Sequence, residues 1–226
     1  MTELTLLSSM APKALLQELA RHYEERRLGT VRLEAAGGVD VAKRVRAGEQ
    51  PDVVVLARNS IDDLAGEGLL EAASVCDVAA SGIGIAAPAR APRLEVADVE
   101  SLKRTISAAS SLSYSTGPSG VYLQKLFASW GILEAVKSRI VVPPPGISVG
   151  SLLKEGKVQL GFQQLSELIG IEGVTVLGPL PETVQLLTRF SAGVSSRSRE
   201  RQAAEAFVKF MGGGEHAAVR IRFGMQ

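Results

Sequence analysis

Cysteine and histidine are almost absent from this chain of 226 residues. Cys76 is the single cysteine, so a disulfide within the chain and a cysteine metal site are both excluded. His22 and His216 are the only histidines, and their wide separation gives no metal-binding spacing. We therefore expect neither a metal ion nor another cofactor.

Aromatic residues, excess charge and long apolar runs are scarce as well. Aromatics make up 4% of the chain and the formal net charge is +1, so no stacking platform or basic surface for nucleic acid is expected. No apolar run approaches the length of a membrane span, and the first residues lack the features of a signal peptide. As written, the sequence predicts a cytoplasmic protein, whereas a removed signal peptide would make it periplasmic.

The overall composition is that of an ordinary globular protein, with 46% hydrophobic and 22% charged residues. Apolar spacing predicts strands and helices in alternation, which is typical of an α/β domain with a mainly parallel sheet. The expected strands of this first part are 4–7, 31–35 and 52–56, and the expected helices are 14–23, 39–47 and 60–66. A second α/β part follows, with expected strands at 111–114, 140–142 and 158–162 and a helix at 121–130 that has Val121 on its apolar side.

Two long extended runs, 78–87 and 184–194, separate these parts. They predict that the chain leaves one lobe, builds the other and returns. The expected fold is therefore α/β and two-lobed, with two hinge crossings and a cleft. Residues 1–80 and 190–226 would form lobe one, and residues 81–189 lobe two.

The stretch 115–120 reads Ser-Thr-Gly-Pro-Ser-Gly and runs directly into the helix at 121–130. Free backbone N–H groups and the helix dipole favour an anion at such a start, and the three hydroxyls add donors without bulk. An ordinary helix cap with a turn is the alternative interpretation. Ligands of α/β sheets bind at the carboxyl ends of strands, which adds the loops 8–12, 36–40 and 163–166.

Four stretches in order resemble the type II periplasmic solute-binding proteins, closest to the molybdate-binding branch of ABC transporters. They are Leu-Leu-Ser-Ser at 6–9, Val-Ala-Lys-Arg-Val-Arg-Ala-Gly at 41–48 before Pro-Asp-Val-Val at 51–54, the loop at 115–120, and Leu-Lys-Glu-Gly-Lys-Val-Gln-Leu-Gly-Phe at 153–162. The resemblance implies a two-lobed fold, a small anionic ligand and an ABC permease as possible partner.

The resemblance also implies where a ligand would lie. Family members hold molybdate or tungstate with serine hydroxyls at the first two loops and usually a tyrosine in lobe two. Here the first serine position falls near Ala11, with Ser8 and Ser9 close by, while Gly37 with Gly38 and Gln164 occupy the other two. Glycine permits close backbone approach and glutamine offers an amide, so these departures favour a larger anion with several carboxylates over molybdate.

The ligand-binding candidates therefore come from all four loops. They are Ser8, Ser9, Met10, Gly37, Gly38, Ser115, Thr116, Gly117, Ser119, Gly120, Tyr122, Gln163 and Gln164. Basic residues near these loops would help to hold carboxylates, and the candidates by position are Lys13, Lys43 and Arg189.

The same branch includes aconitate isomerase, so the resemblance implies an alternative function. Such an enzyme needs an anion cradle and a base that moves a proton next to a carboxylate. The sequence singles out no base, although Tyr114, Tyr122, Glu167 and Lys13 lie near the predicted loops. A transcription-factor effector domain of the same fold is disfavoured, because no helix-turn-helix segment is visible.

Overall fold

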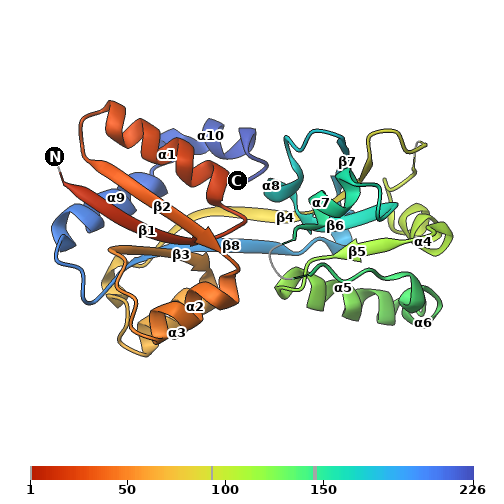
Figure 1. Ribbon diagram of the computed structural model, residues 1–226, viewed down its shortest axis with the longest axis horizontal. Helices are drawn as coiled ribbons and strands as arrows, with labels where there is room; N and C mark the ends of the chain where they lie inside the picture. The colour runs from red at the N-terminus through yellow and green to blue at the C-terminus, as the bar shows by residue number, and fades with distance from the viewer. Residues whose placement is uncertain (1, 93, 145–146) are drawn as a thin grey trace. The chain divides into compact units, whose positions relative to one another are not determined.

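The computed structural model of the protein describes residues 2–92, 94–144 and 147–226. Strands and helices alternate along the chain as the apolar spacing predicts (Figure 1). The elements are β1 (Glu3–Ser9), α1 (Lys13–Glu25), β2 (Thr30–Ala36), α2 (Gly38–Arg46), β3 (Val53–Ala57), α3 (Arg58–Gly66), β4 (Cys76–Pro88), α4 (Val99–Ala108), β5 (Leu112–Tyr114), α5 (Pro118–Ser129), α6 (Leu133–Val136), α7 (Val149–Lys154), β6 (Leu160–Gln164), α8 (Leu165–Leu168), β7 (Val174–Pro179), β8 (Leu187–Val194), α9 (Arg201–Gly212) and α10 (Ala217–Arg222).

The chain divides into two compact units. Unit 1 comprises Met1–Ser81 and Thr188–Gln226, and unit 2 comprises Gly82–Leu187. The chain passes between them twice, within β4 and at the start of β8, and these two strands are neighbours in the sheet order. The two expected extended runs are thus adjacent strands.

The sheet of unit 1 has the order β2-β1-β3-β8. β1 runs parallel to β2 and to β3, with Leu6 opposite both Leu33 and Val53, whereas β8 is antiparallel to β3. Because parallel strands end at the same edge, the carboxyl ends of β1, β2 and β3 lie together. Each of these strands leads directly into α1, α2 or α3, so three helices begin at that edge.

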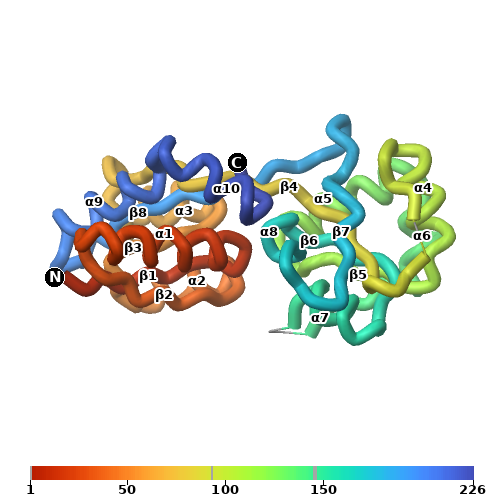
Figure 2. Tube along the Cα trace, turned by 90° about the horizontal axis from the view of Figure 1, so that it is seen from above, coloured from red at the N-terminus to blue at the C-terminus, as the bar shows by residue number. Residues whose placement is uncertain are grey.

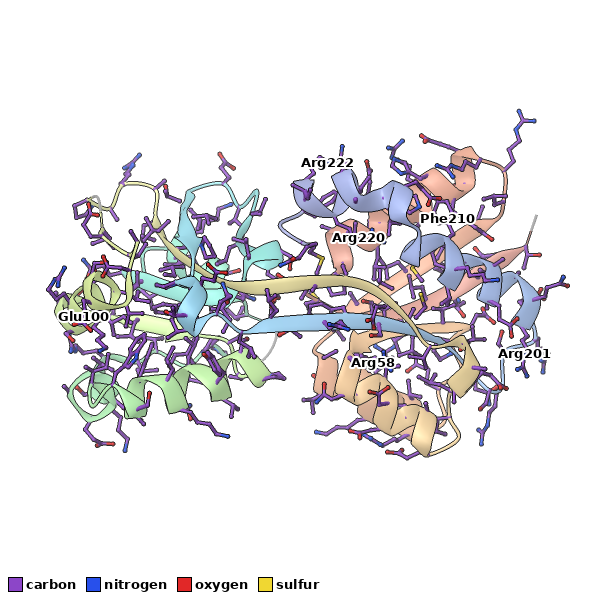
Figure 3. All side chains as sticks on the ribbon, turned by 180° about the vertical axis from the view of Figure 1, so that it is seen from behind. Arg58, Glu100, Arg201, Phe210, Arg220 and Arg222 are labelled. Carbon is purple, nitrogen blue, oxygen red and sulfur yellow. The ribbon has the colours of Figure 1, made fainter. Side chains whose placement is uncertain are left out.

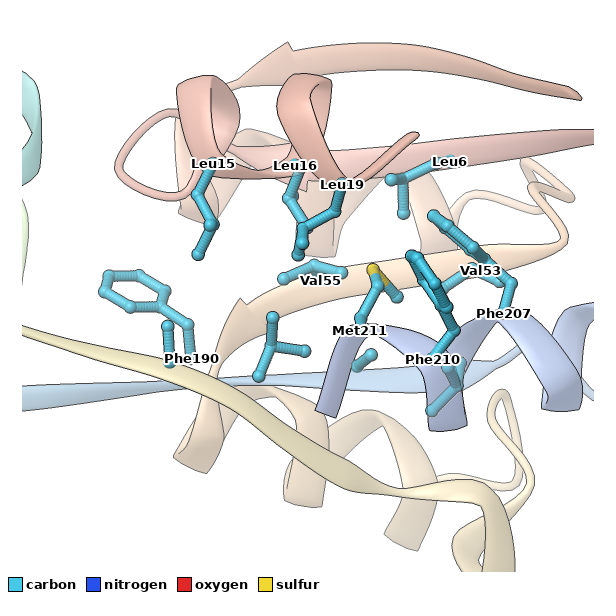
Figure 4. Close-up of a cluster of buried hydrophobic side chains, with 14 of the residues drawn as sticks. Leu6, Leu15, Leu16, Leu19, Val53, Val55, Phe190, Phe207, Phe210 and Met211 are labelled. Carbon is cyan, nitrogen blue, oxygen red and sulfur yellow. The ribbon is translucent and has the colours of Figure 1, made fainter. Parts of the chain in front are cut away.

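Both faces of this sheet are covered, which explains the continuous apolar run of β3. On one face, α1 and α9 pack against the strands through a cluster that includes Leu16, Val53, Val55 and Phe207 (Figure 4). On the other face, α2 and α3 bury a second cluster (Figure 1). Full burial of each large apolar side chain stabilises the fold by about 1.5–3 kcal/mol.

The end of the chain is fixed to the sheet of unit 1 by backbone pairing. Ala80 N–H donates to the Gln226 carbonyl at 2.7 Å, and Gln226 N–H donates to the Ala80 carbonyl at 2.9 Å. Figure 2 shows the C-terminus beside β4. The last residues therefore add a short extension to the sheet, next to the segment of β4 that leaves unit 1.

In unit 2, β6 lies between β4 and β5. It is antiparallel to β4 and parallel to β5, with Tyr114 opposite Phe162, and β7 also pairs with β4. The core of this unit contains Leu123, Phe127 and Phe162, so α5 packs on the face of the sheet that carries Phe162.

Three expectations for the middle of the chain are wrong in detail. Val121 is 51% exposed, because the buried side of α5 runs through Leu123, Leu126 and Phe127. The expected strand at 140–142 is only a bridge from Ile140 to Leu112, since the prolines that follow cannot donate to a ladder. The second extended run begins at Leu187 and not at 184, because Glu182–Val184 forms a 3-10 turn.

None of the helices in the described ranges is both long enough and apolar enough to cross a lipid bilayer.

Candidate functional site

The first candidate region, edge site 1, lies at the carboxyl ends of β1, β2 and β3 in unit 1 and includes Ser8, Ser9, Met10, Gly37 and Gly38. α1, α2 and α3 begin here, and no side chain in the described part of the chain caps any of their three N-termini. The first N–H groups of a helix lack intrahelical acceptors and carry partial positive charge. Three such starts at one sheet edge form a region that favours an anion.

Ser8 and Ser9 differ in what their hydroxyls do. The Ser8 hydroxyl donates to the Ser9 carbonyl at 2.9 Å, whereas the Ser9 hydroxyl is buried and has no hydrogen-bond partner among the described residues. Ser9 pairs with Ala36, and a Cβ atom at Gly38 would lie 3.6 Å from the Ser9 Cβ. A buried polar group without a partner costs about 1–3 kcal/mol, so the fold alone does not explain the Ser9 hydroxyl.

The basic residues Lys13 and Arg58 begin two of the helices that start at edge site 1. Lys13 is the first residue of α1, is half-buried, and makes no ion pair with any residue that the structure describes. Arg58 begins α3 and binds Asp77 at 3.1 Å, as Arg189 also does (Figure 3 labels Arg58). Burial raises the pKa of Asp77, but hydrogen bonds from Ser191, Arg58 and Arg189 outweigh it and leave the pKa lowered. Of these three cations, only Lys13 is free to meet a ligand.

The second candidate region, edge site 2, lies in unit 2 where β5 and β6 end, and it includes the stretch 115–120 with Gln163 and Gln164. The Ser115 N–H donates to the Phe162 carbonyl at 3.3 Å, which holds the loop against β6. The Ser115 and Ser119 hydroxyls are hydrogen-bonded to each other at 2.8 Å, and Thr116 is exposed. Gly117 precedes α5, and no described side chain caps this helix, so its start is also open to an anion.

Gln163 and Gln164 are both buried at the end of β6. The Gln163 amide has two partners, because its Nε2 donates to Glu167 Oε1 at 2.8 Å and its Oε1 accepts from the Gly150 N–H at 3.3 Å. Burial raises the pKa of Glu167 to about 7, and the hydrogen bond from Gln163 offsets only part of that rise. A carboxyl that exchanges its proton near neutral pH is suited to acid–base chemistry.

The remaining candidate residues differ in what their side chains contact and in whether they are exposed. The Tyr122 hydroxyl donates to the Val184 carbonyl at 2.8 Å, so it serves the packing of unit 2. Tyr114 is buried edge-on against Phe127 in the core. Met10 is 43% exposed after β1, and Lys43 is exposed on α2.

Metal binding finds no support in the acidic and histidine side chains. Within residues 2–92, 94–144 and 147–226, no group of three or more His, Cys, Asp or Glu side chains is arranged to hold an ion. The two histidine rings stack at 6.3 Å, but His216 is buried against Phe210.

Known proteins resemble this chain over nearly its whole length. The family described as bacterial extracellular solute-binding proteins matches residues 4–226. An aconitate isomerase of a Pseudomonas species is 30% identical over 218 residues, which cover 93% of this chain and 82% of that enzyme.

Solved structures of anion-binding proteins share the fold. The periplasmic molybdate-binding protein of Azotobacter vinelandii superposes with a TM-score of 0.82 at 19% identity, over 99% of this chain and 98% of that one. The substrate-binding domain of a putative molybdenum ABC transporter from Clostridium difficile gives a TM-score of 0.78 at 14% identity, over 100% and 99% of the two chains.

Proposed function

This protein belongs to the family of bacterial extracellular solute-binding proteins, and we propose that its ligand is a small organic anion with several carboxylates. The observation that carries the proposal is the buried Ser9 hydroxyl, which has no partner among the described residues and lies beside the uncapped start of α2. A carboxylate oxygen at this place would accept from the hydroxyl and from helix N–H groups. Such charge-assisted hydrogen bonds are about twice as strong as neutral ones.

The donors at the two edge sites suit carboxylates better than a tetrahedral oxyanion. A small oxyanion needs many donors that converge on one point, and Gly37 and Gly38 contribute backbone but no hydroxyl there. The Gln163 amide is already engaged by Glu167 and Gly150. The 30% identical relative acts on a tricarboxylate by its name, whereas the molybdate-binding structure is 19% identical.

As a receptor, the protein would deliver this anion to a membrane permease of the ABC type. The support for this role is the family and the fold shared with the substrate-binding domain of a molybdenum transporter. The role predicts that the native protein works in the periplasm.

Parallel calorimetric titrations test the ligand class. We expect saturable binding of trans-aconitate, cis-aconitate or citrate and none of molybdate or sulfate. Ser119→Ala should weaken binding about tenfold, which corresponds to about 1.4 kcal/mol. Ser129→Ala is the matched control, because its hydroxyl donates to the Leu126 carbonyl at the far end of α5. Tight molybdate binding without tricarboxylate binding would overturn the proposal.

A second candidate function is isomerisation of the same anion, and the 30% identity to an aconitate isomerase over 93% of the chain favours it. An ultraviolet absorbance assay of cis- and trans-aconitate interconversion decides between the two functions. Binding without turnover identifies a receptor, and turnover identifies an enzyme.

A further inference from the structure

We propose that Glu167 is the acid–base group that moves a proton on the bound carboxylate anion, and that Gln163 positions it. The inference rests on the second candidate function of the preceding section. It concerns edge site 2, where the loop at 115–120 and the end of β6 meet through the hydrogen bond from Ser115 to Phe162. Glu167 follows that strand end directly, in the single turn of α8.

The Gln163 amide holds the carboxyl in a defined orientation. Its oxygen is occupied by the Gly150 N–H, so its NH₂ group faces Glu167 Oε1 at 2.8 Å. The backbone at Gly150, which donates to this amide, and at Gly161 is closely packed by neighbouring side chains. A Cβ atom at Gly150 would lie 2.2 Å from the Ile171 Cδ1, and one at Gly161 would lie 2.6 Å from a Val149 methyl carbon.

Among the residues that the structure describes, Glu167 has no charged partner that would make it part of a structural ion pair. Gln163 is the one side chain that donates to its carboxyl among the described residues, and no cation forms a salt bridge with it there. β6 and β7, which pack against α8, contain no titratable residue. Glu167 is half-buried, and carboxylates withdrawn from water are normally paired with a cation, so a stabilising ion pair does not explain this residue.

The burial has a chemical consequence. With the pKa of Glu167 raised to about 7, its acid and base forms are both populated at neutral pH. Acid–base groups work best when their pKa lies near the working pH, and they contribute about 10²- to 10⁴-fold in rate. Two other candidates are engaged elsewhere, because the Tyr122 hydroxyl donates to the Val184 carbonyl and Tyr114 packs against Phe127 in the core.

The proton shift balances without a co-reactant. Ionised Glu167 removes a proton from the CH₂ carbon next to a carboxylate of aconitate, and the C–H electron pair forms a new double bond to the central carbon. The electron pair of the old double bond moves to the former vinyl carbon, which takes the proton back from Glu167. Atoms and charge are unchanged, and the double bond has moved by one position.

Glu167→Gln tests the proposal, because glutamine has the same shape and cannot take a proton. Glu172→Gln is the matched control, since Glu172 is an exposed carboxylate only five residues away. We expect Glu167→Gln to bind trans-aconitate within a few-fold of the wild type but to lose at least 100-fold in interconversion. Exchange of the substrate CH₂ protons in D₂O, followed by NMR, should disappear in parallel. The control should retain all three properties.

Gln163→Leu tests the positioning role through the pH profile. Its hydrogen bond lowers the pKa of Glu167, so the acid limb of kcat/KM should move to higher pH in this variant, an effect that loss of packing alone would not produce.

The possible outcomes distinguish the ligand class, the isomerase activity and the role of Glu167. If the wild type binds no tricarboxylate, the proposed ligand class is wrong. If it binds but neither converts aconitate nor exchanges its protons, the isomerase candidate and the role of Glu167 both fail while the ligand class stands. If the wild type converts aconitate and Glu167→Gln converts it equally well, the assignment of Glu167 alone is overturned.

Discussion

A Cβ atom at Gly120 would lie 1.7 Å from the carbonyl oxygen of Ser115. The first turn of α5 therefore packs against its own preceding loop so closely that only glycine fits. Because the obstructing atom belongs to the backbone, a side chain at position 120 must displace the loop. Gly120 thus fixes the shape of edge site 2 without contributing a donor through a side chain.

We predict that Gly120→Ala destabilises unit 2 by about 1–3 kcal/mol, the usual cost of overpacking, and weakens anion binding. Gly117→Ala is the control, since a Cβ atom there meets nothing within 4 Å, and its cost should stay below about 1 kcal/mol. Urea unfolding followed by the fluorescence of Trp130, the single tryptophan, reports on unit 2. Equal stability of the two variants would show that the loop yields freely.

We predict that Ser9→Ala increases the stability of the fold and weakens anion binding. The variant removes a buried hydroxyl that has no partner in the described part of the chain, so unfolding should cost up to about 1–3 kcal/mol more than in the wild type. Anion binding should weaken at the same time. Ser8→Ala loses the hydrogen bond to the Ser9 carbonyl and should instead lose stability. A Ser9→Ala variant that binds with wild-type affinity contradicts the role of this hydroxyl.

Ser8 and Ser9 also illustrate how far the sequence could specify the site. The apolar run at 4–7 and the helical spacing at 14–23 predict a strand followed by a helix, and the structure has both, but β1 continues through Ser8 and ends at Ser9, two residues beyond the expected end. Alternate residues of a strand face opposite sides, and a one-residue shift in register exchanges them. Sequence alone therefore does not distinguish the Ser9 hydroxyl, which has no partner in the described ranges, from the bonded Ser8 hydroxyl.

Glu167 shows the same limit in unit 2. The sequence shows that Glu167 lies near a predicted loop. Its raised pKa, however, results from burial, and its orientation results from the hydrogen bond with the Gln163 amide. That amide is itself oriented by Gly150, thirteen residues earlier, so the relevant contacts are tertiary. The prediction that Val121 lies on the buried side of α5 is wrong for a similar reason, because the sheet that α5 contacts determines which face of the helix is buried.

Glu167→Gln should raise the stability of unit 2 above pH 7. The pKa of Glu167 is raised from 4.5 to about 7 in the folded protein, so its stabilisation is fully present below about pH 4.5 and is lost as pH rises through 7. The difference between variant and wild type should grow from near zero at pH 4 to as much as about 3 kcal/mol at pH 8. Urea unfolding by Trp130 fluorescence at both pH values measures it, and a constant difference would refute the raised pKa.

His216 should produce the opposite slope in unit 1. Burial lowers its pKa below 6.5, and Arg26, Arg220 and His22 lower it further, whereas Glu215 raises it. Since the unfolded chain then binds more protons, stability should fall as pH drops below about 6.5. Circular dichroism at pH 5.5 and 7.5 should show this loss in the wild type and not in His216→Leu, and Glu215→Gln should make it larger. A wild type equally stable at both pH values, once the Glu167 contribution is subtracted, would be inconsistent with the burial of a neutral ring.

Arg220 is buried in unit 1 (Figure 3 labels it). It donates to the carbonyls of Val78 at 2.6 Å, Met211 at 2.8 Å and Gly213 at 3.0 Å, and so connects β4 with the end of α9. Burial lowers its pKa, and the opposing effects of Cys76 and Glu215 offset only part of that change. Arg220→Met would leave these carbonyls, which lie buried or partly buried, without this donor.

We therefore expect Arg220→Met to cost about 3 kcal/mol or more, because each deprived carbonyl contributes about 1 kcal/mol or above. Arg222→Met is the control on the same helix. Arg222 pairs with Glu18 at the surface, where an ion pair contributes about 0–1 kcal/mol. Urea unfolding followed by far-ultraviolet circular dichroism compares the two variants. Equal losses would mean that the buried hydrogen bonds of Arg220 add nothing beyond a surface contact, and that α9 is held to β4 by apolar packing alone.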